Sequence, residues 1–121
     1  MKSMLFGALL ALGCVASASA ADYRWGTLSV DTTKLNSDAG YGVGGGDTEA
    51  EAERNAQTFC SEDGAGGCKV VLTYRQCGAL AVPSSGASYG WAKAATEQAA
   101  KAGALEICNE RSCKIVASDC N

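Results

Sequence analysis

Hydrophobic and polar positions follow one order along the chain twice. From Thr48 a threonine and a glutamate open an alanine-rich segment that ends at Cys60, and a polar, glycine-rich loop leads to Cys68-Lys69-Val70-Val71. The same order returns from Thr96 to Cys108 and continues as Cys113-Lys114-Ile115-Val116. Small apolar residues at helical spacing favour amphipathic helices, and β-branched runs favour strands. The pattern therefore predicts a helix, a loop and a strand, repeated once.

Each predicted helix has one apolar stripe that should face a sheet. The two stripes correspond position by position: Ala52, Ala56, Phe59 and Cys60 in the first helix, and Ala100, Ala104, Ile107 and Cys108 in the second. The second helix ends Ala-Leu-x-x-Cys, whereas the first lacks that leucine, so Phe59 is expected to fill the packing position there. Thr48 and Glu51 have the spacing of a capping box, which predicts that the first helix begins at Thr48.

Strands are predicted before and after each helix. They cover Trp25–Val30, Tyr41–Gly46 and Cys68–Tyr74, and then Cys77–Val82, Tyr89–Ala94 and Cys113–Ser118. The segment GTLSV at residues 26–30 matches GALAV at residues 78–82. The predicted fold class is therefore α+β, a pseudo-twofold tandem β-β-α-β repeat with about six strands and two helices. Repeat one spans about 25–76 and repeat two about 77–120, and the halves should share one core because one unit cannot cover its own apolar face.

The first residues have the features of a signal peptide. Lys2 precedes an apolar segment too short to span a bilayer, and Ala18-Ser19-Ala20 fits a signal-peptidase site, which predicts residues 1–20 as the leader and residues 21–121 as a single domain. An alternative is lipid attachment at Cys14, since Ala11-Leu12-Gly13-Cys14 resembles a lipoprotein box. Either way the protein is expected to be exported, to the periplasm or the medium or to the envelope surface through Cys14, without a membrane span.

Six cysteines remain after the leader, an even number that favours a disulfide framework in an exported chain. Matching the two repeats suggests three bridges: Cys60 with Cys68, Cys108 with Cys113, and Cys77 with Cys120 between the halves. Six cysteines permit 15 pairings, so the other connectivities stay open. The chain has no histidine and no paired Cys-x-x-Cys motifs, so neither a metal site nor a cofactor is predicted.

The combination of repeated motifs resembles a known bacterial family. Tyr-Gly precedes each helix, and the chain also carries Cys68-Lys69-Val70-Val71, the segment CGALAV at residues 77–82, and Tyr89-Gly90-Trp91-Ala92. These features resemble the exported family called domain of unknown function 4189 over Trp25 to Cys120. The resemblance implies a small exported bacterial protein and carries no established activity.

Several motifs suggest chemistry but have simpler explanations. Gly40-x-Gly42-x-x-Gly45 matches a dinucleotide fingerprint, but the second repeat keeps only small residues at alternate positions there, which favours packing of a strand against a helix. The net charge of −3 and the absence of a basic stripe argue against nucleic acid.

Catalysis is uncertain from the sequence, with non-enzymatic function favoured. Ser84, Ser85, Ser88 and Lys93 show no catalytic spacing, and no histidine is present as a base. A paired-carboxylate hydrolase stays open, because acidic residues could meet in space, the candidates being Asp31, Asp38, Asp47 and Asp119.

Four aromatic residues are the candidate binding residues: Trp91, Tyr89, Tyr41 and Trp25. Trp91 replaces Val43 of the first repeat and follows a distinct loop, so it could anchor a protein or stack on a sugar. The leading hypothesis is a non-enzymatic protein-binding module, such as an inhibitor, immunity factor or secreted effector, present as a monomer or weak dimer. The alternative is a cell-envelope protein that binds or acts on carbohydrate through acidic residues.

Overall fold

Two β-β-α-β units make up the described part of the chain, as a computed structural model shows for residues 23–36, 38–62, 66–86 and 88–121. The first contains β1 (Trp25–Asp31), β2 (Tyr41–Gly46), α2 (Glu49–Glu62) and β3 (Cys68–Tyr74). The second contains β4 (Cys77–Val82), β5 (Gly90–Ala94), α3 (Glu97–Cys108) and β6 (Lys114–Cys120). These elements confirm the predicted fold class and the repeat; the leader and Cys14 lie outside the described residues.

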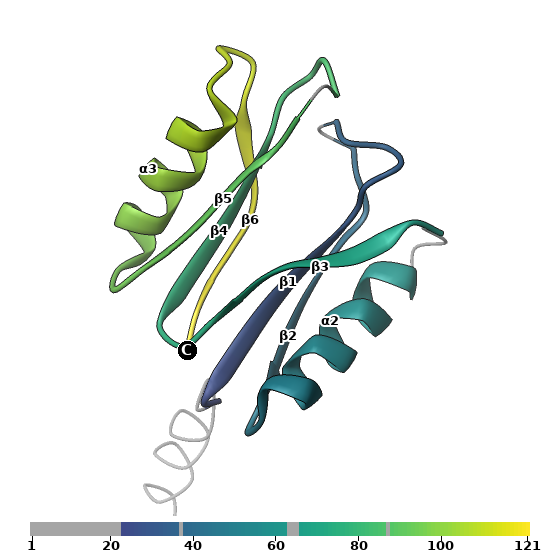
Figure 1. Ribbon diagram of the computed structural model, residues 1–121, viewed down its shortest axis with the longest axis vertical. Helices are drawn as coiled ribbons and strands as arrows, with labels where there is room; N and C mark the ends of the chain where they lie inside the picture. The colour runs from purple at the N-terminus through teal and green to yellow at the C-terminus, as the bar shows by residue number, and fades with distance from the viewer. Residues whose placement is uncertain (1–22, 37, 63–65, 87) are drawn as a thin grey trace, which may run out of the picture.

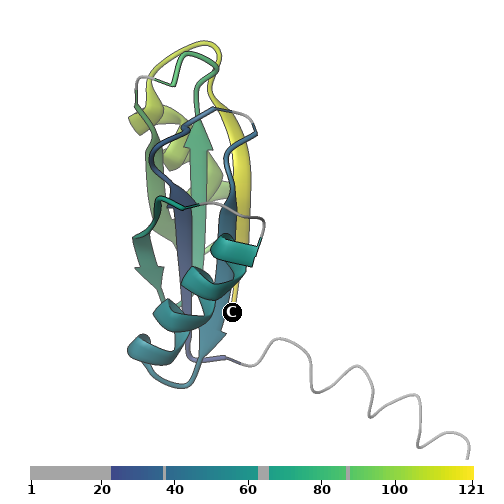
Figure 2. The ribbon, with the colours of Figure 1, turned by 90° about the vertical axis from the view of Figure 1, so that its right-hand side faces the viewer.

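Each unit forms its own antiparallel three-stranded sheet, and the two sheets stack face to face. The strand orders are β2-β1-β3 and β5-β4-β6, so the first strand of each unit is central. From left to right Figure 1 shows α3, the second sheet, the first sheet and α2, which are four layers with the helices outside. Figure 2, turned by 90°, shows α2 lying across the outer face of its sheet. Each helix contacts only its own sheet closely, and the sheets join the halves.

The core between the two sheets is formed by alternate residues of the strands. Leu28 and Val30 of β1 meet Leu80 of β4, and the cluster also contains Leu72, Tyr74, Ala39 and Ala117. Residues of opposite phase face the helices. On β4 these are Cys77, Ala79 and Ala81, which pack against Ala100 and Ala104 of α3. The shared core that the sequence predicts is therefore present.

The helices lie unusually close to the strands because small residues line both sides of the contact. A Cβ placed on Gly42 of β2 would meet the carbonyl oxygen of Ala56, and one on Gly90 of β5 would meet that of Ala104. The central glycine of the apparent dinucleotide fingerprint, Gly42, thus faces a helix backbone, whereas Gly45 faces the Tyr23 ring. This position supports the packing interpretation of that motif.

The predicted apolar stripes are wrong at Phe59 and Ile107. The buried residues of α2 are Ala52, Ala56 and Cys60, whereas Phe59 is 50% exposed; in α3, Ile107 is 58% exposed. Buried positions at i, i+4 and i+8 drift around the helix, so residue i+7 lies about 60° from the centre of that stripe. The close approach of alanine to glycine also leaves no space for a large side chain there.

All three proposed disulfide pairs are present: Cys60–Cys68, Cys108–Cys113 and Cys77–Cys120. The first two link the end of a helix to the following strand region. The expectation that Cys77–Cys120 joins the halves is wrong, because these residues pair directly between β4 and β6 of one sheet. The two units are therefore connected by packing and by the short turn from β3 to β4, not by a disulfide.

Candidate functional site

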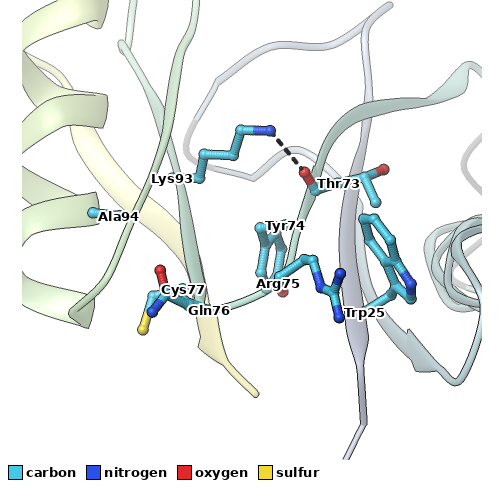
Figure 3. A pocket seen from close by; sticks show the side chains of 8 residues that line it. All are labelled: Trp25, Thr73, Tyr74, Arg75, Gln76, Cys77, Lys93 and Ala94. Carbon is cyan, nitrogen blue, oxygen red and sulfur yellow. Dashed lines mark hydrogen bonds between the residues drawn. The ribbon is translucent and has the colours of Figure 1, made fainter.

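A groove of about 350 Å³ lies where β3 of one unit passes β5 of the other. We call it the Trp25–Lys93 groove. Its lining residues are Trp25, Thr73, Tyr74, Arg75, Gln76, Cys77, Lys93 and Ala94. Figure 3 shows Lys93 on one side and Trp25 with Arg75 on the other. The lining combines two cations with an indole and contains no carboxylate.

Arg75 and Trp25 form one wall of this groove. Arg75 stands in the turn after β3, and its guanidinium carbon lies 4.8 Å from the centroid of the Trp25 ring. This distance is that of a cation–π contact, which orients the guanidinium group. Repeat matching gives Cys77 and Cys120 as the counterparts of Trp25 and Arg75 in the second unit. The aromatic contact therefore occupies the place that the third disulfide holds in the other sheet.

Lys93 supplies the second cation. It lies on β5 opposite Gly78, and its Nζ donates to the carbonyl oxygen of Thr73 across the groove at 3.4 Å. Among the described residues the ion pair is Lys101 with Glu97, so no carboxylate neutralises Lys93 or Arg75 in that part of the chain. The carboxylate of Glu53 does lie next to the lining, since its Oε2 accepts from the Thr73 hydroxyl at 3.3 Å, but it makes no ion pair with Lys93 or Arg75.

The pseudo-twofold axis generates a second groove with different chemistry. It has a volume of about 380 Å³ and is lined by Tyr23, Val43, Gly44, Gly45, Asn55, Phe59, Asp119, Cys120 and Asn121. Gly45 occupies the place of Lys93, and Cys120 that of Arg75. The second groove contains a carboxylate and no cation, so the positive charge of the first is not a requirement of the fold.

Tyr74 and Asp119 are equivalent positions that bond to each other between the units. The Tyr74 hydroxyl donates to Oδ2 of Asp119 at 2.7 Å. Burial raises the pKa of Tyr74 far above its ordinary value, and the bond to Asp119 adds to the effect. The phenol thus stays protonated and fixed, and it serves the structure as a link between the sheets.

The four aromatic candidates from the sequence lie in different places. Trp25 lines the groove, and Trp91 is 40% exposed on the same face of β5 as Lys93, two residues away. Tyr89 packs against the core between the sheets. Tyr41 is 43% exposed on β2, which the strand order places at the opposite edge of its sheet from β3. The structure brings together Trp25 and Lys93 in one groove, whereas Trp91 lies outside its lining. Arg75 and Gln76 are groove residues that sequence reasoning missed.

The acidic candidates do not form a shared site. Asp31 ends β1 and accepts from the backbone and hydroxyl of Thr33, whose hydroxyl is the main cause of the lowered pKa of Asp31. Asp47 follows β2 at the other end of the β1–β2 pair, Asp38 is exposed in the loop between those strands, and Asp119 is bonded to Tyr74. Within the described ranges, no group of three or more His, Cys, Asp or Glu residues could hold a metal ion.

Two of the serine candidates, Ser84 and Ser85, are likewise separated from Lys93. The Ser85 hydroxyl donates to Oε1 of Glu110 at 3.0 Å, and Ser84 donates its backbone N–H to Ser112. These serines follow Val82, at the opposite end of β4 from Gly78, which pairs with Lys93. A serine–lysine pair therefore does not form between these residues.

The architecture defines a small disulfide-containing α+β protein built from two β-β-α-β units. The chain matches the family described as Domain of unknown function (DUF4189) over residues 25–120, and it belongs to that family. A solved structure with a similar fold is the NMR structure of Rv1813c from Mycobacterium tuberculosis, with a TM-score of 0.52 and 22% sequence identity, covering 78% of this chain and 75% of that chain. No curated protein matches this chain. Across the described residues, no helix has the length and apolar character needed to span a membrane.

Proposed function

We propose that this protein is an exported, non-catalytic module that binds another protein through the side on which β3 and β5 meet. The observation that carries the proposal is Trp91, which is 40% exposed on β5, two residues from Lys93 of the Trp25–Lys93 groove. Exposed tryptophan next to a preformed hollow is typical of the anchors that contribute most to protein interfaces.

A rigid framework supports this proposal. The three disulfides restrain both units, and the sheets share a closely packed core. A surface held this firmly loses little conformational entropy when it binds. An inhibitor, an immunity factor and a secreted effector all use such a surface, and oxidised cysteines fit an exported location.

Carbohydrate binding is less well supported by the groove. The Arg75 guanidinium group lies over the Trp25 ring, so that indole face is already covered. The acidic residues expected for a carbohydrate-acting protein also do not converge. Trp91 alone could accept a sugar ring, and a protein anchor uses the same exposed surface more fully because Lys93 lies two residues away on the same face of β5.

Affinity capture with variants tests the proposal. Oxidised protein of residues 21–121 would be immobilised as wild type, Trp91→Ala and Ile107→Ala, and exposed to periplasm and medium. Ile107 is a matched control, since it is an exposed apolar residue on α3 outside the groove. We expect a protein that wild type and Ile107→Ala retain and Trp91→Ala loses, with all three proteins giving the same far-UV circular dichroism.

Two outcomes would overturn the proposal. One is capture of the same proteins by wild type and both variants, which would place any binding elsewhere. The other is turnover of a substrate by the purified protein that a single carboxylate substitution abolishes.

A further inference from the structure

We infer that the Trp25–Lys93 groove binds an acidic, extended peptide segment, with a carboxylate held between Arg75 and Lys93. The inference rests on the proposed protein-binding function and specifies the chemistry of the partner. No activity is required, because recognition uses only charge, hydrogen bonding and an open strand edge.

Charge complementarity is the first support. The whole chain has a net charge of −3, yet the groove lining has two cations and no carboxylate. Arg75 presents a planar set of donors, and its contact with Trp25 orients them, which suits a two-pronged bond to a carboxylate. The Nζ of Lys93 makes one hydrogen bond, to the Thr73 carbonyl oxygen at 3.4 Å. An incoming carboxylate can therefore add to that contact or replace it.

The second unit provides an internal comparison. Its equivalent groove has Gly45 and Cys120 where the first has Lys93 and Arg75. That side of the molecule folds and packs without either cation. Arg75 has a structural role through Trp25, and Lys93 makes one hydrogen bond to the Thr73 carbonyl between the units. The side chain of Lys93 is otherwise exposed at the groove edge.

Strand geometry favours a peptide over other anions. β5 is an edge strand, paired on one side with β4 in the order β5-β4-β6. An edge strand offers backbone N–H and C=O groups to an extended segment, as in strand addition. Trp91 and Lys93 lie on one face of β5, so alternate side chains of a bound segment could meet the indole and the ammonium group. A sugar would lack the backbone groups that match this edge.

The test uses a fluorescein-labelled nine-residue peptide of alternating glutamate and threonine. Its glutamine-for-glutamate counterpart and tetragalacturonate serve as comparison probes. Binding to the oxidised protein would be measured by fluorescence anisotropy at two NaCl concentrations and mapped by 15N NMR, with the Trp25 indole N–H as a local reporter. We expect the glutamate peptide to bind and to shift the Trp25 indole signal. Its affinity should fall at higher salt, because salt screens the charges.

Charge variants make the test specific. Lys93→Gln should lower the affinity for the glutamate peptide by about three- to tenfold, the loss expected for one partly solvated charge-assisted hydrogen bond. Lys114→Gln is the matched control, because Lys114 is an exposed lysine on β6 opposite Val82, at the far end of the sheet. It should leave binding within about twofold of wild type, a change typical of a surface charge outside the interface.

The inference fails if the glutamine peptide binds as tightly as the glutamate peptide, or if Lys93→Gln and Lys114→Gln behave alike. It also fails if shifts cluster at Val43 and Asn55 of the second groove, or if tetragalacturonate binds and the peptide does not. A Trp91-dependent protein partner without glutamate-peptide binding would refute this inference and leave the proposed function intact. Glutamate-peptide binding without a Trp91-dependent protein partner would support this inference and contradict the proposed function.

Discussion

Tyr74 fills a slot that two equivalent glycines create between the sheets. A Cβ on Gly26 or on Gly78 would meet the Tyr74 ring, so both positions must be glycine for the ring to lie there. The ring is almost fully buried, and its hydroxyl reaches Asp119 at 2.7 Å. One side chain thereby contacts both β1 and β4 and bonds to β6.

Tyr74→Phe should lower the free energy of unfolding by about 1–3 kcal/mol, because it keeps the ring but leaves Asp119 without its phenol donor. Urea unfolding followed by far-UV circular dichroism measures the change. Tyr41→Phe is the control, since Tyr41 is exposed at the sheet edge, and it should unfold like wild type. Equal midpoints for wild type and Tyr74→Phe would show that the hydrogen bond contributes nothing to stability.

Asp31 should make the free energy of unfolding depend on pH in the acidic range. Its carboxylate accepts from the hydroxyl and the backbone N–H of Thr33, and these bonds hold the pKa of Asp31 below its ordinary value of 3.8. A group with a lower pKa in the folded state contributes stability above its unfolded pKa, and that contribution is lost as pH falls through the folded pKa.

The urea midpoint should therefore fall as the pH drops below about 4, the range in which unfolded aspartates take up protons. Asp31→Asn should show a smaller fall across that range, measured by urea titrations at several pH values. Asp38→Asn changes an exposed aspartate in the same loop and should keep the wild-type profile. Identical profiles for all three proteins would exclude Asp31 as a source of the acid sensitivity.

At the scale of elements, each helix–strand pair depends on backbone contact rather than on large side chains. In both units a glycine of the outer strand lies under the helix carbonyl of an alanine: Gly42 under Ala56 and Gly90 under Ala104. Such close contact between helix and strand backbones gives favourable dispersion attraction, and it leaves no room for one extra methyl group.

Gly42→Ala and Gly90→Ala should each destabilise the protein by about 1–3 kcal/mol or more, because the helix must move away from its sheet. Thermal unfolding by differential scanning calorimetry gives the measurement. Gly66→Ala is the matched control, since nothing lies within 4 Å of the added carbon there. Melting temperatures that match this control would mean that the helices adjust without cost.

Sequence reasoning located the elements well because the repeat displays each one twice. Alternation, capping residues and cysteine positions are local properties, and they gave the six strands and two helices found in the described part of the chain. Phe59 and Ile107 were misplaced because periodicity alone does not show where around a helix the sheet contact is centred. The last strand also extends to Cys120, beyond the predicted Ser118, because its pairing with Cys77 continues the ladder.

At the scale of the whole molecule, the candidate site depends on how two sheets meet. Trp25, Arg75 and Lys93 are far apart in sequence and belong to both units, so no local pattern could join them. Repeat matching did offer one signal, because Arg75 stands in the first unit at the position where the second unit has the disulfide-bonded Cys120. The sequence could thus show where the halves differ, but only the packing of β3 beside β5 shows that these differences form a groove.

The position of the third disulfide makes the interface between the units separable. Cys60–Cys68 lies within residues 23–76, and Cys77–Cys120 and Cys108–Cys113 lie within residues 77–121. Cutting the exposed turn between Gln76 and Cys77 would therefore leave every disulfide inside one fragment. The fragments would still be held by the packing of Leu28 and Val30 against Leu80. Hydrogen bonds from Tyr74 to Asp119, from Lys93 to the Thr73 carbonyl and from Asn121 to the backbone of residues 74–76 also join them.

Each oxidised fragment alone should lack fixed tertiary structure, because the apolar face of its three-stranded sheet would be exposed to water. An equimolar mixture should recover the near-UV circular dichroism and the dispersed NMR spectrum of the intact chain, and Tyr74→Phe in the first fragment should weaken this association. A fragment that folds as a monomer by itself would show that one β-β-α-β unit is self-sufficient. In that case the sheet-to-sheet core would serve mainly to align β3 with β5. The groove would then depend on association of the two units and not on the folding of each unit.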